Sequence, residues 1–512
     1  LYISNHDEDV PKRIAFDFSG WRKVKIRGEG AVFLFHTDIL PFHLDRCQEI
    51  LIEGITIDYE RTGYSEGEIV ELSGKRMVLR IDRKEYPYRV FHGELYFEEE
   101  GAYHPLYYGC LEMDRRRNAP VYQGRDISFN RPYPSSYGAV FREAGENLVE
   151  VTLTEDQQFP ETSREGNRMI LRHHLRTHPC FYITRSEGIT LRDITIYHCT
   201  GMAVISQFTK DITIERVCLV RHPQKDRIFT ATADGFHFVY AGGKIHIKNC
   251  VLENQLDDPV NIHGIYGRIH KVTSKREVIV ELVEGMQKGV LLGTAGDYFA
   301  VIDNRTMLEQ EHAVITEITW MNSDYQRIVF AEDMENLIPG FVVENQSWVP
   351  DVLIEGCTFR NNRARGLLLT SAGDVLVRDN TFETPGAAIL IEGDSNYWFE
   401  SGATRHIVIE GNRFHQCAYV SAWGKAPIQV SPSALVWEKD RRYHQYLEVR
   451  GNVFQCCDDR LVNAVNLKKL VFLDNKIERT TVFEPIKGQA LELDGVLEVE
   501  TDINKQSGDM SR

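Results

Sequence analysis

Three carboxylates in two short motifs are the residues of this chain best suited to acid–base chemistry. One motif is Ala233-Asp234-Gly235-Phe236, and the other is Leu256-Asp257-Asp258-Pro259-Val260-Asn261. Asp257 follows Asp234 by 23 residues. If 23 residues make one turn of a stacked coil, the three carboxylates gather at one place. A protonated carboxyl can give a proton to a leaving group, while a neighbouring ionised carboxylate activates water. Together they carry out the acid–base chemistry of hydrolysis.

A repeat with this base period runs through most of the chain. Its signature is a short run of alternating apolar and mostly polar residues, which is typical of a half-buried strand. Ten copies begin at Val24, Ile50, Ile189, Ile212, Ile245, Val352, Val375, Ile407, Leu447 and Leu470. From Ile189 onward the spacings are 23, 33, 107, 23, 32, 40 and 23 residues. One base period, coils with longer loops and one large insertion predict a solenoid, here a parallel β-helix.

A second inward position follows five residues after each of the later signatures. It carries Ile194, Val217, Cys250, Cys357, Asn380, Asn412, Asn452 and Asn475. Four asparagines in succession at one register predict an internal asparagine ladder. Cys250 and Cys357 then act as small buried apolar residues.

Two long gaps in the repeat predict inserted domains. Residues 61–175 and 265–348 contain alternating segments that favour antiparallel hairpins, and each is large enough for a small barrel or sandwich. The fold class is therefore all-β. We predict a β-helix start at 1–60, a first inserted β-barrel-like domain at 61–175, aspartate-bearing coils at 176–264, a second inserted domain at 265–348, and C-terminal coils at 349–505.

Composition narrows the partners. The net charge of −16 disfavours nucleic acid, anionic membranes and polyanionic substrates, and no apolar run reaches membrane-spanning length. The ten cysteines include the adjacent Cys456 and Cys457 but no pair with zinc-ligand spacing, and they assign no disulfide. The chain begins with Leu1 rather than Met. We therefore expect a processed or trimmed start, and with a removed signal peptide a secreted or periplasmic location.

Aligning the coils places Asp234, Asp258 and Arg365 at the beginning of three strands. Asp234 and Asp258 should project from neighbouring coils about 5 Å apart, with Asp257 emerging at the turn. Two like charges so close should raise one pKa, and Arg365 would bias both. Each aspartate alone is better explained as a turn residue that caps its own backbone. Three at one register favour function.

The chain resembles glycoside hydrolase family 110, the exo-acting α-1,3-galactosidases. The resemblance covers nearly the whole length and includes Ser4-Asn5-His6-Asp7, Asp234-Gly235-Phe236-His237, the Asp257-Asp258 motif and the segment 393–401. It implies a right-handed β-helix interrupted by β-barrel domains, and an inverting mechanism without a metal or other cofactor. It also implies that Asp257 is the general acid and that Asp234 and Asp258 hold and activate the water. The substrate is then a galactose-terminated glycan, either branched as in blood group B or linear.

Further residues are candidates for sugar binding. In the loop 393–402, Trp398 could stack on galactose. The remaining candidates for hydrogen bonds to its hydroxyls are Glu392, Asp394, Asn396, Glu400, Arg365, His237 and His263. The alternative is that Tyr397-Trp398-Phe399 packs this loop onto the coils. Asp226 and Arg227, in the long turn 222–232, are weaker candidates for overhanging the pocket.

Three other functions stay open. A pectin-type β-helix hydrolase needs Gly-His-Gly and Arg-Ile-Lys motifs, and this chain offers only Ile262-His263-Gly264. A β-helix polysaccharide lyase relies on basic residues and calcium, which three carboxylates could hold. A binding protein would carry out no chemistry. The oligomeric state is undetermined, a homodimer included.

Overall fold

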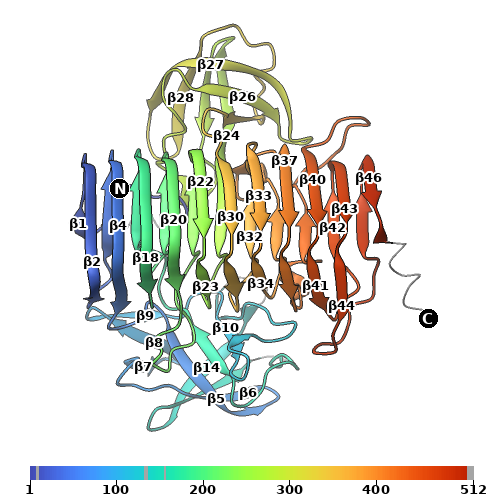
Figure 1. The fold of residues 1–512 in the computed structure, drawn as a ribbon. Helices are drawn as coiled ribbons and strands as arrows, with labels where there is room; N and C mark the ends of the chain where they lie inside the picture. Colours follow the sequence, from blue (N-terminus) through green and yellow to red (C-terminus); the bar gives the residue numbers. More distant parts are fainter. Residues whose placement is uncertain (7–10, 132–135, 155–156, 504–512) are drawn as a thin grey trace, which may run out of the picture.

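The computed structural model describes residues 1–6, 11–131, 136–154 and 157–503. Asp7, which belongs to one of the motifs above, lies outside these ranges. Parallel strands stack side by side along one axis from the N-terminal to the C-terminal coil, and two inserted domains project from opposite sides (Figure 1). The architecture is the parallel β-helix that the repeat predicts.

One wall of the β-helix carries the site. Its strands pair in parallel, each with the equivalent strand of the neighbouring coil. In order along the axis they are β1 (Ile14–Asp17), β3 (Leu40–Asp45), β17 (Phe181–Thr184), β19 (Val204–Gln207), β21 (Phe236–Val239), β24 (Val260–Ser274), β32 (Leu367–Leu369), β35 (Ile389–Ile391), β39 (Ile428–Val430), β42 (Val462–Val465) and β45 (Leu491–Asp494).

The opposite sheet contains the repeat signatures. It comprises β2 (Arg22–Phe35), β4 (Gln48–Tyr59), β18 (Glu187–Ile196), β20 (Lys210–Leu219), β22 (Gly242–Lys248), β30 (Asp351–Glu355), β33 (Asp374–Arg378), β37 (His406–Glu410), β40 (His444–Arg450), β43 (Leu467–Leu473) and β46 (Glu498–Thr501). Shorter strands continue the later coils: β23 (Val251–Glu253), β31 (Thr358–Arg360), β34 (Thr381–Glu383), β38 (Arg413–His415), β41 (Val453–Cys456) and β44 (Lys476–Arg479).

The predicted register is confirmed residue by residue. All ten signature residues, Val24 to Leu470, pair with one another from coil to coil, including Ile245 with Val352 across the second insertion. Their side chains form the continuous apolar core of the β-helix. Alternation fixes this register, because a slip of one residue would turn the apolar set toward solvent.

The asparagine ladder is also confirmed. The Asn412 side-chain oxygen accepts the backbone N–H of Asn380 at 2.9 Å, and its Nδ2 donates to the Val377 carbonyl at 2.9 Å. Asn452 and Asn475 repeat the pattern on the next coils. Above the ladder, Cys250 and Cys357 are buried, and all ten cysteines are unpaired.

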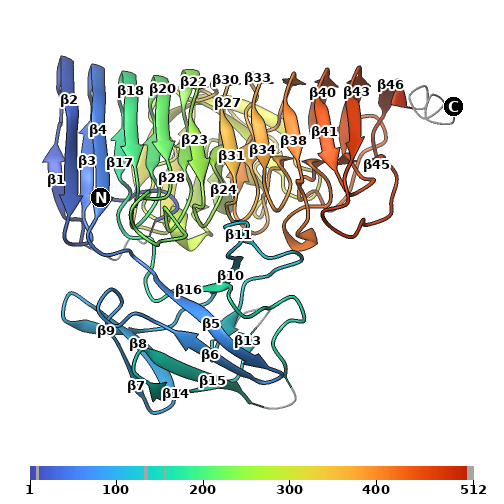
Figure 2. The same cartoon turned by 60° about the horizontal axis from the view of Figure 1, so that its bottom comes forward.

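The first inserted domain packs around its own apolar core. Its main sheet is antiparallel and ordered β11-β10-β16-β5-β6-β15-β14. Those strands are β5 (Ser65–Ser73), β6 (Arg76–Arg80), β10 (Leu111–Asp114), β11 (Ala119–Pro120), β14 (Ala139–Gly145), β15 (Leu148–Leu153) and β16 (Arg168–Leu171). Two small sheets add β7 (Tyr88–Phe91), β8 (Glu94–Glu99) and β9 (Ala102–Pro105), and β12 (Ser128–Phe129) with β13 (Ser136–Tyr137). Figure 2 shows this domain hanging below the coils.

The second inserted domain is a closed antiparallel barrel. The strand pairings run β24–β25–β28–β27–β26–β29 and return to β24, whose first residues belong to the β-helix. Its other strands are β25 (Glu277–Glu281), β26 (Tyr298–Asp303), β27 (Leu308–Trp320), β28 (Tyr325–Phe330) and β29 (Val342–Asn345). Strand β36 (Glu400–Ser401) also pairs with β24. Short 3-10 turns are η1 (Gly285–Gln287) and η2 (Ser421–Trp423).

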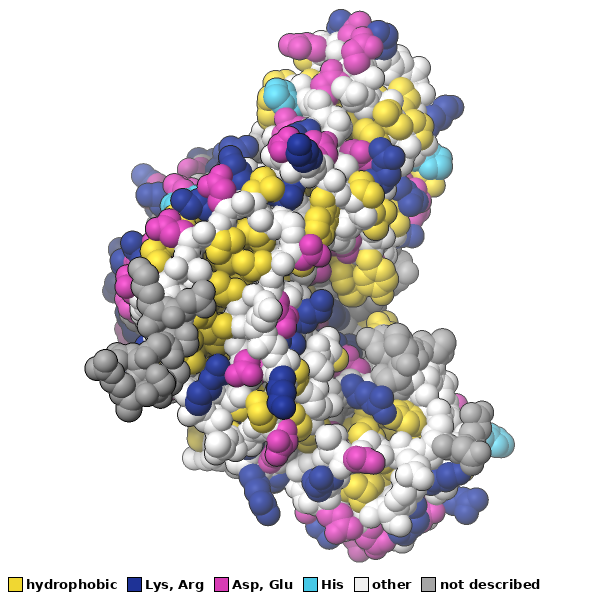
Figure 3. All heavy atoms as spheres, turned by 90° about the vertical axis from the view of Figure 1, so that its right-hand side faces the viewer, with side chains coloured by type: hydrophobic (Ala, Val, Ile, Leu, Met, Phe, Trp, Pro, Cys, Tyr) yellow, Lys and Arg dark blue, Asp and Glu magenta, His cyan; other side chains and the backbone are white. Residues whose placement is uncertain are grey.

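None of the helical turns in the described ranges has the length and apolar character needed to cross a lipid bilayer. Seen from the C-terminal end, acidic and basic side chains are mixed over both inserted domains, and the molecule is hollowed between them (Figure 3).

Candidate active site

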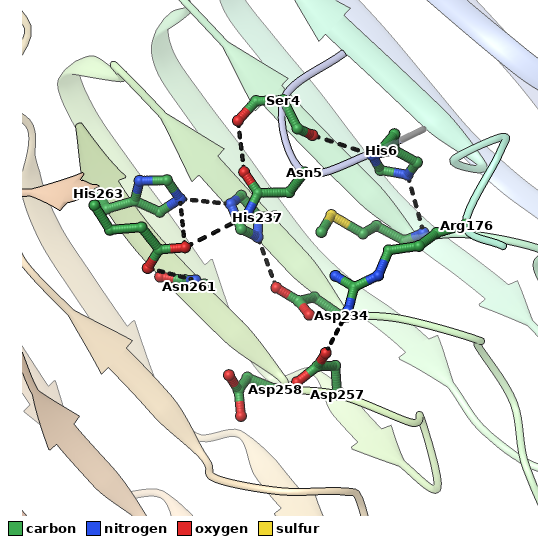
Figure 4. A network of polar contacts seen from close by, with 12 residues as sticks. Ser4, Asn5, His6, Arg176, Asp234, His237, Asp257, Asp258, Asn261 and His263 are labelled. Atoms are coloured by element: carbon green, nitrogen blue, oxygen red, sulfur yellow. Dashed lines mark hydrogen bonds and ion pairs between the residues drawn. The ribbon is translucent and has the colours of Figure 1, made fainter. Parts of the chain in front are cut away.

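The β-helix places Asp234, Asp258 and Arg365 at one register. Each lies two residues before its strand, and the strands align Phe236 with Val260 and Val260 with Leu367. Asp257 approaches from the turn before β24. The three carboxylates therefore meet at the end of this wall where its strands begin (Figure 4). The gathering of these residues follows from the strand pairing alone.

A small pocket of about 60 Å³ lies over these carboxylates. Seven of the candidate residues line it: Asp234, Asp257, Asp258, Arg365, Glu392, Trp398 and Glu400. Asn5, Arg176, Asn261, Met286 and Leu368 complete the wall. A larger cavity of about 710 Å³ lies between the second barrel and the later coils but contains none of the three aspartates. The ionisable groups converge on the smaller pocket, which makes it the candidate active site.

Asp258 is held by one arginine. Arg365 donates from Nη2 to Oδ2 at 2.6 Å and from Nε to Oδ1 at 3.1 Å, and its backbone N–H reaches Oδ1 at 2.9 Å. Burial nevertheless raises the pKa of Asp258 to about 6, with Arg365 opposing and Asp257 reinforcing the shift. Asp258 is therefore mostly ionised at neutral pH and can accept a proton.

Asp257 has a different environment. Arg176 donates to its Oδ2 at 3.0 Å, and Arg363 donates to its Oδ1 at 3.3 Å. Burial raises the pKa of Asp257, but the guanidinium groups of Arg363, Arg176 and Arg365 outweigh burial and leave the pKa below its usual value. In the free protein Asp257 is thus the carboxylate most stabilised as an anion.

Asp234 has the strongest tendency of the three to stay protonated. Burial and the neighbouring charge of Asp257 raise its pKa well above the usual value. Its Oδ2 lies 2.6 Å from Nδ1 of His237, and His237 in turn contacts His263. Both imidazole side chains are fully buried behind Asp234. This is a correction to their expected place against the sugar, because a fully covered ring offers no atom to a ligand.

The loop 393–402 divides into an anchor and a pocket wall. Asp394 is buried and accepts the backbone N–H groups of Asn396, Tyr397 and Trp398. The Asn396 side chain donates to the Ser433 carbonyl at 3.1 Å. Asp394 therefore anchors the loop, and the Asn396 amide ties it to Asn304 and Ser433 outside it. Neither residue lines the small pocket, which corrects their expected role in sugar binding.

The other half of this loop faces the pocket. Phe399 is buried in a cluster with Tyr266 and Tyr443, whereas 41% of Trp398 is exposed at the pocket. Glu400 accepts from Asn5 at 3.3 Å and from Asn261 at 3.5 Å. Burial raises the pKa of Glu392 to about 7. Packing through Phe399 thus leaves Trp398 available to a ligand.

The turn 222–232 does not reach the pocket. Asp226 pairs with Arg115 and Arg168 of the first inserted domain, and Arg227 is buried against Asp58 and the Tyr59 carbonyl. Asp226 thus joins the turn to the first inserted domain, and Arg227 joins the turn to the early coils. This corrects their expected position over the aspartates, since their side chains are held by ion pairs elsewhere.

Sequence reasoning missed the arginines that contact Asp257. Arg176 precedes β17 by five residues, and Arg363 stands two residues before Arg365. The Arg363-Ala364-Arg365 pattern was a usable signal, because two arginines flanking a turn can point to one charge cluster. Arg176 carries no such mark. Asn5 belongs to the Ser4-Asn5-His6-Asp7 motif, but only folding brings either residue near the aspartates.

The chain is similar to known proteins over nearly its whole length. Residues 65–168 match the family model described as GLAA-B beta-barrel domain I. Alpha-1,3-galactosidase B of Bacteroides thetaiotaomicron is 27% identical over 99% of this chain and 83% of its own. Alpha-1,3-galactosidase A of Shewanella woodyi is 28% identical over 95% and 79%, and alpha-1,3-galactosidase B of Bacteroides fragilis is 29% identical over 94% and 82%.

Among solved structures, the Yersinia enterocolitica family 28 exopolygalacturonase gives a TM-score of 0.34 at 9% identity, covering 93% of this chain and 73% of that chain. A likeness this low carries no functional information.

Proposed function

We propose that this homologue of the α-1,3-galactosidases is a glycoside hydrolase that releases terminal α-1,3-linked galactose from glycans. The observation that carries the proposal is the convergence of Asp234, Asp257 and Asp258 at one pocket in a chain that aligns with these enzymes almost from end to end. Three buried carboxylates with divergent pKa values supply both an acid and a base.

In the proposed reaction Asp257 protonates the glycosidic oxygen as it leaves, while Asp234 and Asp258 hold a water against the opposite face of the anomeric carbon. A bond forms from the water oxygen to that carbon as the bond to the leaving group breaks, and one proton of the water passes to a carboxylate. A single displacement of this kind inverts the α-linkage and yields β-galactose.

The electrostatics of the free site set a condition on this assignment. A proton donor needs a raised pKa, yet Arg176 and Arg363 hold the pKa of Asp257 down. Asp257 can act as the acid only when a bound substrate alters these contacts. Asp234 is the alternative donor, because its pKa is already raised.

The rest of the pocket suits one sugar. The exposed face of Trp398 offers an apolar surface to the ring, and Glu392, Glu400, Asn5 and Asn261 offer acceptors and donors to its hydroxyls. A calcium-dependent lyase is disfavoured by a positive observation: Asp257 and Asp258 are already bound by guanidinium groups, which would repel the cation.

The test is to incubate the wild-type protein with branched and linear α-1,3-galactosyl trisaccharides and follow the first minutes by proton NMR. We expect free galactose from at least one substrate, appearing first as the β-anomer. Initial α-galactose, or a trapped glycosyl-enzyme, would exclude the single displacement. Absence of galactose release from both substrates would leave a binding protein or another specificity.

A further inference from the structure

A line of hydrogen bonds runs from Asp234 into the interior. Asp234 Oδ2 lies 2.6 Å from His237 Nδ1, and His237 Nε2 lies 2.7 Å from His263 Nε2. His263 Nδ1 lies 2.6 Å from the carbonyl oxygen of Gly264. Figure 4 shows the two rings lying in sequence behind the carboxylate. Neither imidazole is exposed, so neither can touch a substrate.

The proton content of this line can be counted. A carbonyl oxygen only accepts, so His263 Nδ1 must carry a proton. The other two contacts each join atoms with lone pairs and also need one proton between them, since two bare lone pairs at this distance repel each other. The three contacts therefore need three protons. An ionised aspartate and two neutral imidazoles supply only two, so the line holds one proton more.

The surroundings favour keeping this additional proton. With it, the line is neutral overall; without it, the line carries a buried negative charge beside the carboxylates of Asp257 and Asp258, which burial disfavours. Glu400 Oε1 lies 3.6 Å from His263 Nε2 and adds a further negative group. The positive charges of Arg176 and Arg365 oppose these negative charges. The nearby His6 adds no positive charge, because burial lowers its pKa well below the usual value.

The location of the proton within the line follows from burial. Burial lowers the pKa of His237 well below its usual value, while burial and Asp257 raise that of Asp234. The shared proton therefore resides on the Asp234 side of the Asp234–His237 contact. Oδ1 of Asp234 stays able to accept a hydrogen bond from the pocket.

We infer that His237 and His263 are positioning residues that keep Asp234 neutral, so that Asp234 orients the water and Asp258 alone takes its proton. This rests on the proposed hydrolysis and refines it. During the reaction the water loses one proton to Asp258, Asp257 supplies one to the leaving oxygen, and the proton of the line stays in place. The line thus separates two aspartates that the sequence treats as equivalent.

The direct test is neutron diffraction from deuterated wild-type crystals at about pH 7, without substrate. We expect three deuterons along the line, one in each contact. Two deuterons would overturn the inference. Because this measurement needs no turnover, it stays decisive if the protein releases no galactose, an outcome that would count against the proposed function alone.

A pair of substitutions tests the catalytic consequence. In His263→Gln the amide can donate to Gly264 and accept from His237, which preserves the donor pattern of a neutral imidazole. In His263→Phe that acceptor is lost, so His237 can carry its proton on Nδ1 and donate to an ionised Asp234. Thermal unfolding of both variants verifies that they are folded.

The expected difference lies in the alkaline limb of the pH profile of kcat/KM, which reports groups of the free enzyme. Asp257 is already ionised in the free protein, so this limb follows the loss of the Asp234 proton. His263→Phe should therefore move the limb to lower pH by at least about one unit, because Asp234 then loses its proton earlier. His263→Gln should keep the wild-type limb. Equal shifts in both variants, or an unmoved limb in His263→Phe, would contradict the assignment.

Discussion

At the scale of single residues, three chemically identical side chains acquire three protonation behaviours. Asp257 contacts two arginines and has a lowered pKa, Asp258 contacts Arg365 and has a pKa of about 6, and Asp234 faces an imidazole and has a strongly raised pKa. Burial acts to raise the pKa of all three aspartates, and the cationic neighbours decide the order of the three values. Division of labour between acid and base follows from such divergence.

The acid can be identified by its dependence on the leaving group. Asp257→Asn should reduce kcat/KM on a natural α-1,3-galactoside by roughly 10³-fold or more, and much less on an activated aryl α-galactoside, whose leaving group needs no proton. Asp258→Asn should reduce both alike, because the base acts on water. Should Asp257→Asn affect both substrates equally while Asp234→Asn spares the aryl galactoside, the acid is Asp234.

At the scale of elements, the β-helix fixes the distance between equivalent residues of neighbouring coils. Parallel pairing fixes equivalent residues of adjacent coils at the strand spacing of about 4.8 Å, so any two residues at one register become neighbours. The site uses this on one wall, and the asparagine ladder uses it inside the later coils. In the ladder each amide hydrogen-bonds to backbone groups of two coils, so each asparagine contributes to the stability of the fold.

The ladder predicts a stability difference at one register. Asn412→Ala leaves the Asn380 N–H and the Val377 carbonyl without their partner in a buried place, and should lower the free energy of unfolding by about 3 kcal/mol. Cys357→Ala, at the same register but without the amide, should cost about 1 kcal/mol. Urea unfolding followed by far-UV circular dichroism measures both. Similar losses for the two variants would refute the stabilising contribution assigned to the asparagine amides.

At the scale of the whole molecule, the site lies where three parts of the chain meet. Met286 in η1 of the second domain and Asn5 of the N-terminal segment line the pocket, and the N–H of Asn5 donates to the Met286 carbonyl at 2.9 Å. From the first inserted domain, Asp126 accepts Nε and Nη2 of Arg363 at 2.8 and 2.7 Å, and Arg363 contacts Asp257. The first inserted domain therefore helps to set the electrostatics of Asp257, and the second contributes to the pocket wall.

This contact predicts an effect of the first domain on catalysis. Asp126→Asn weakens the anchor of Arg363 without touching the pocket, and should lower kcat by roughly tenfold, because Asp257 then loses a partner that fixes its position, and this loss outweighs the accompanying rise in its pKa. Asp226→Asn removes an acidic residue that pairs with Arg115 and Arg168 away from the pocket, and should leave kcat within about twofold. Steady-state rates on one α-1,3-galactoside decide this, and equal rates for Asp126→Asn and wild type would disprove the link.

The sequence by itself determined the β-helix, its register and the meeting of the three aspartates. Alternation of apolar residues dictates which face of each strand is buried, and equal spacing dictates which residues stack, so both can be read locally. Asp234, Asp258 and Arg365 needed nothing more. The secreted or periplasmic location stays a prediction.

Only the tertiary structure decided what covers that wall. His237 and His263 point outward from their strands, as alternation requires, yet the N-terminal segment and β36 bury them and turn expected sugar ligands into partners of Asp234. Arg176 and Asn5 reach the site from segments with no repeat signature. Contacts between sequence-distant, non-periodic segments leave no mark in a local pattern, because their geometry exists only once the coils and inserted domains have packed.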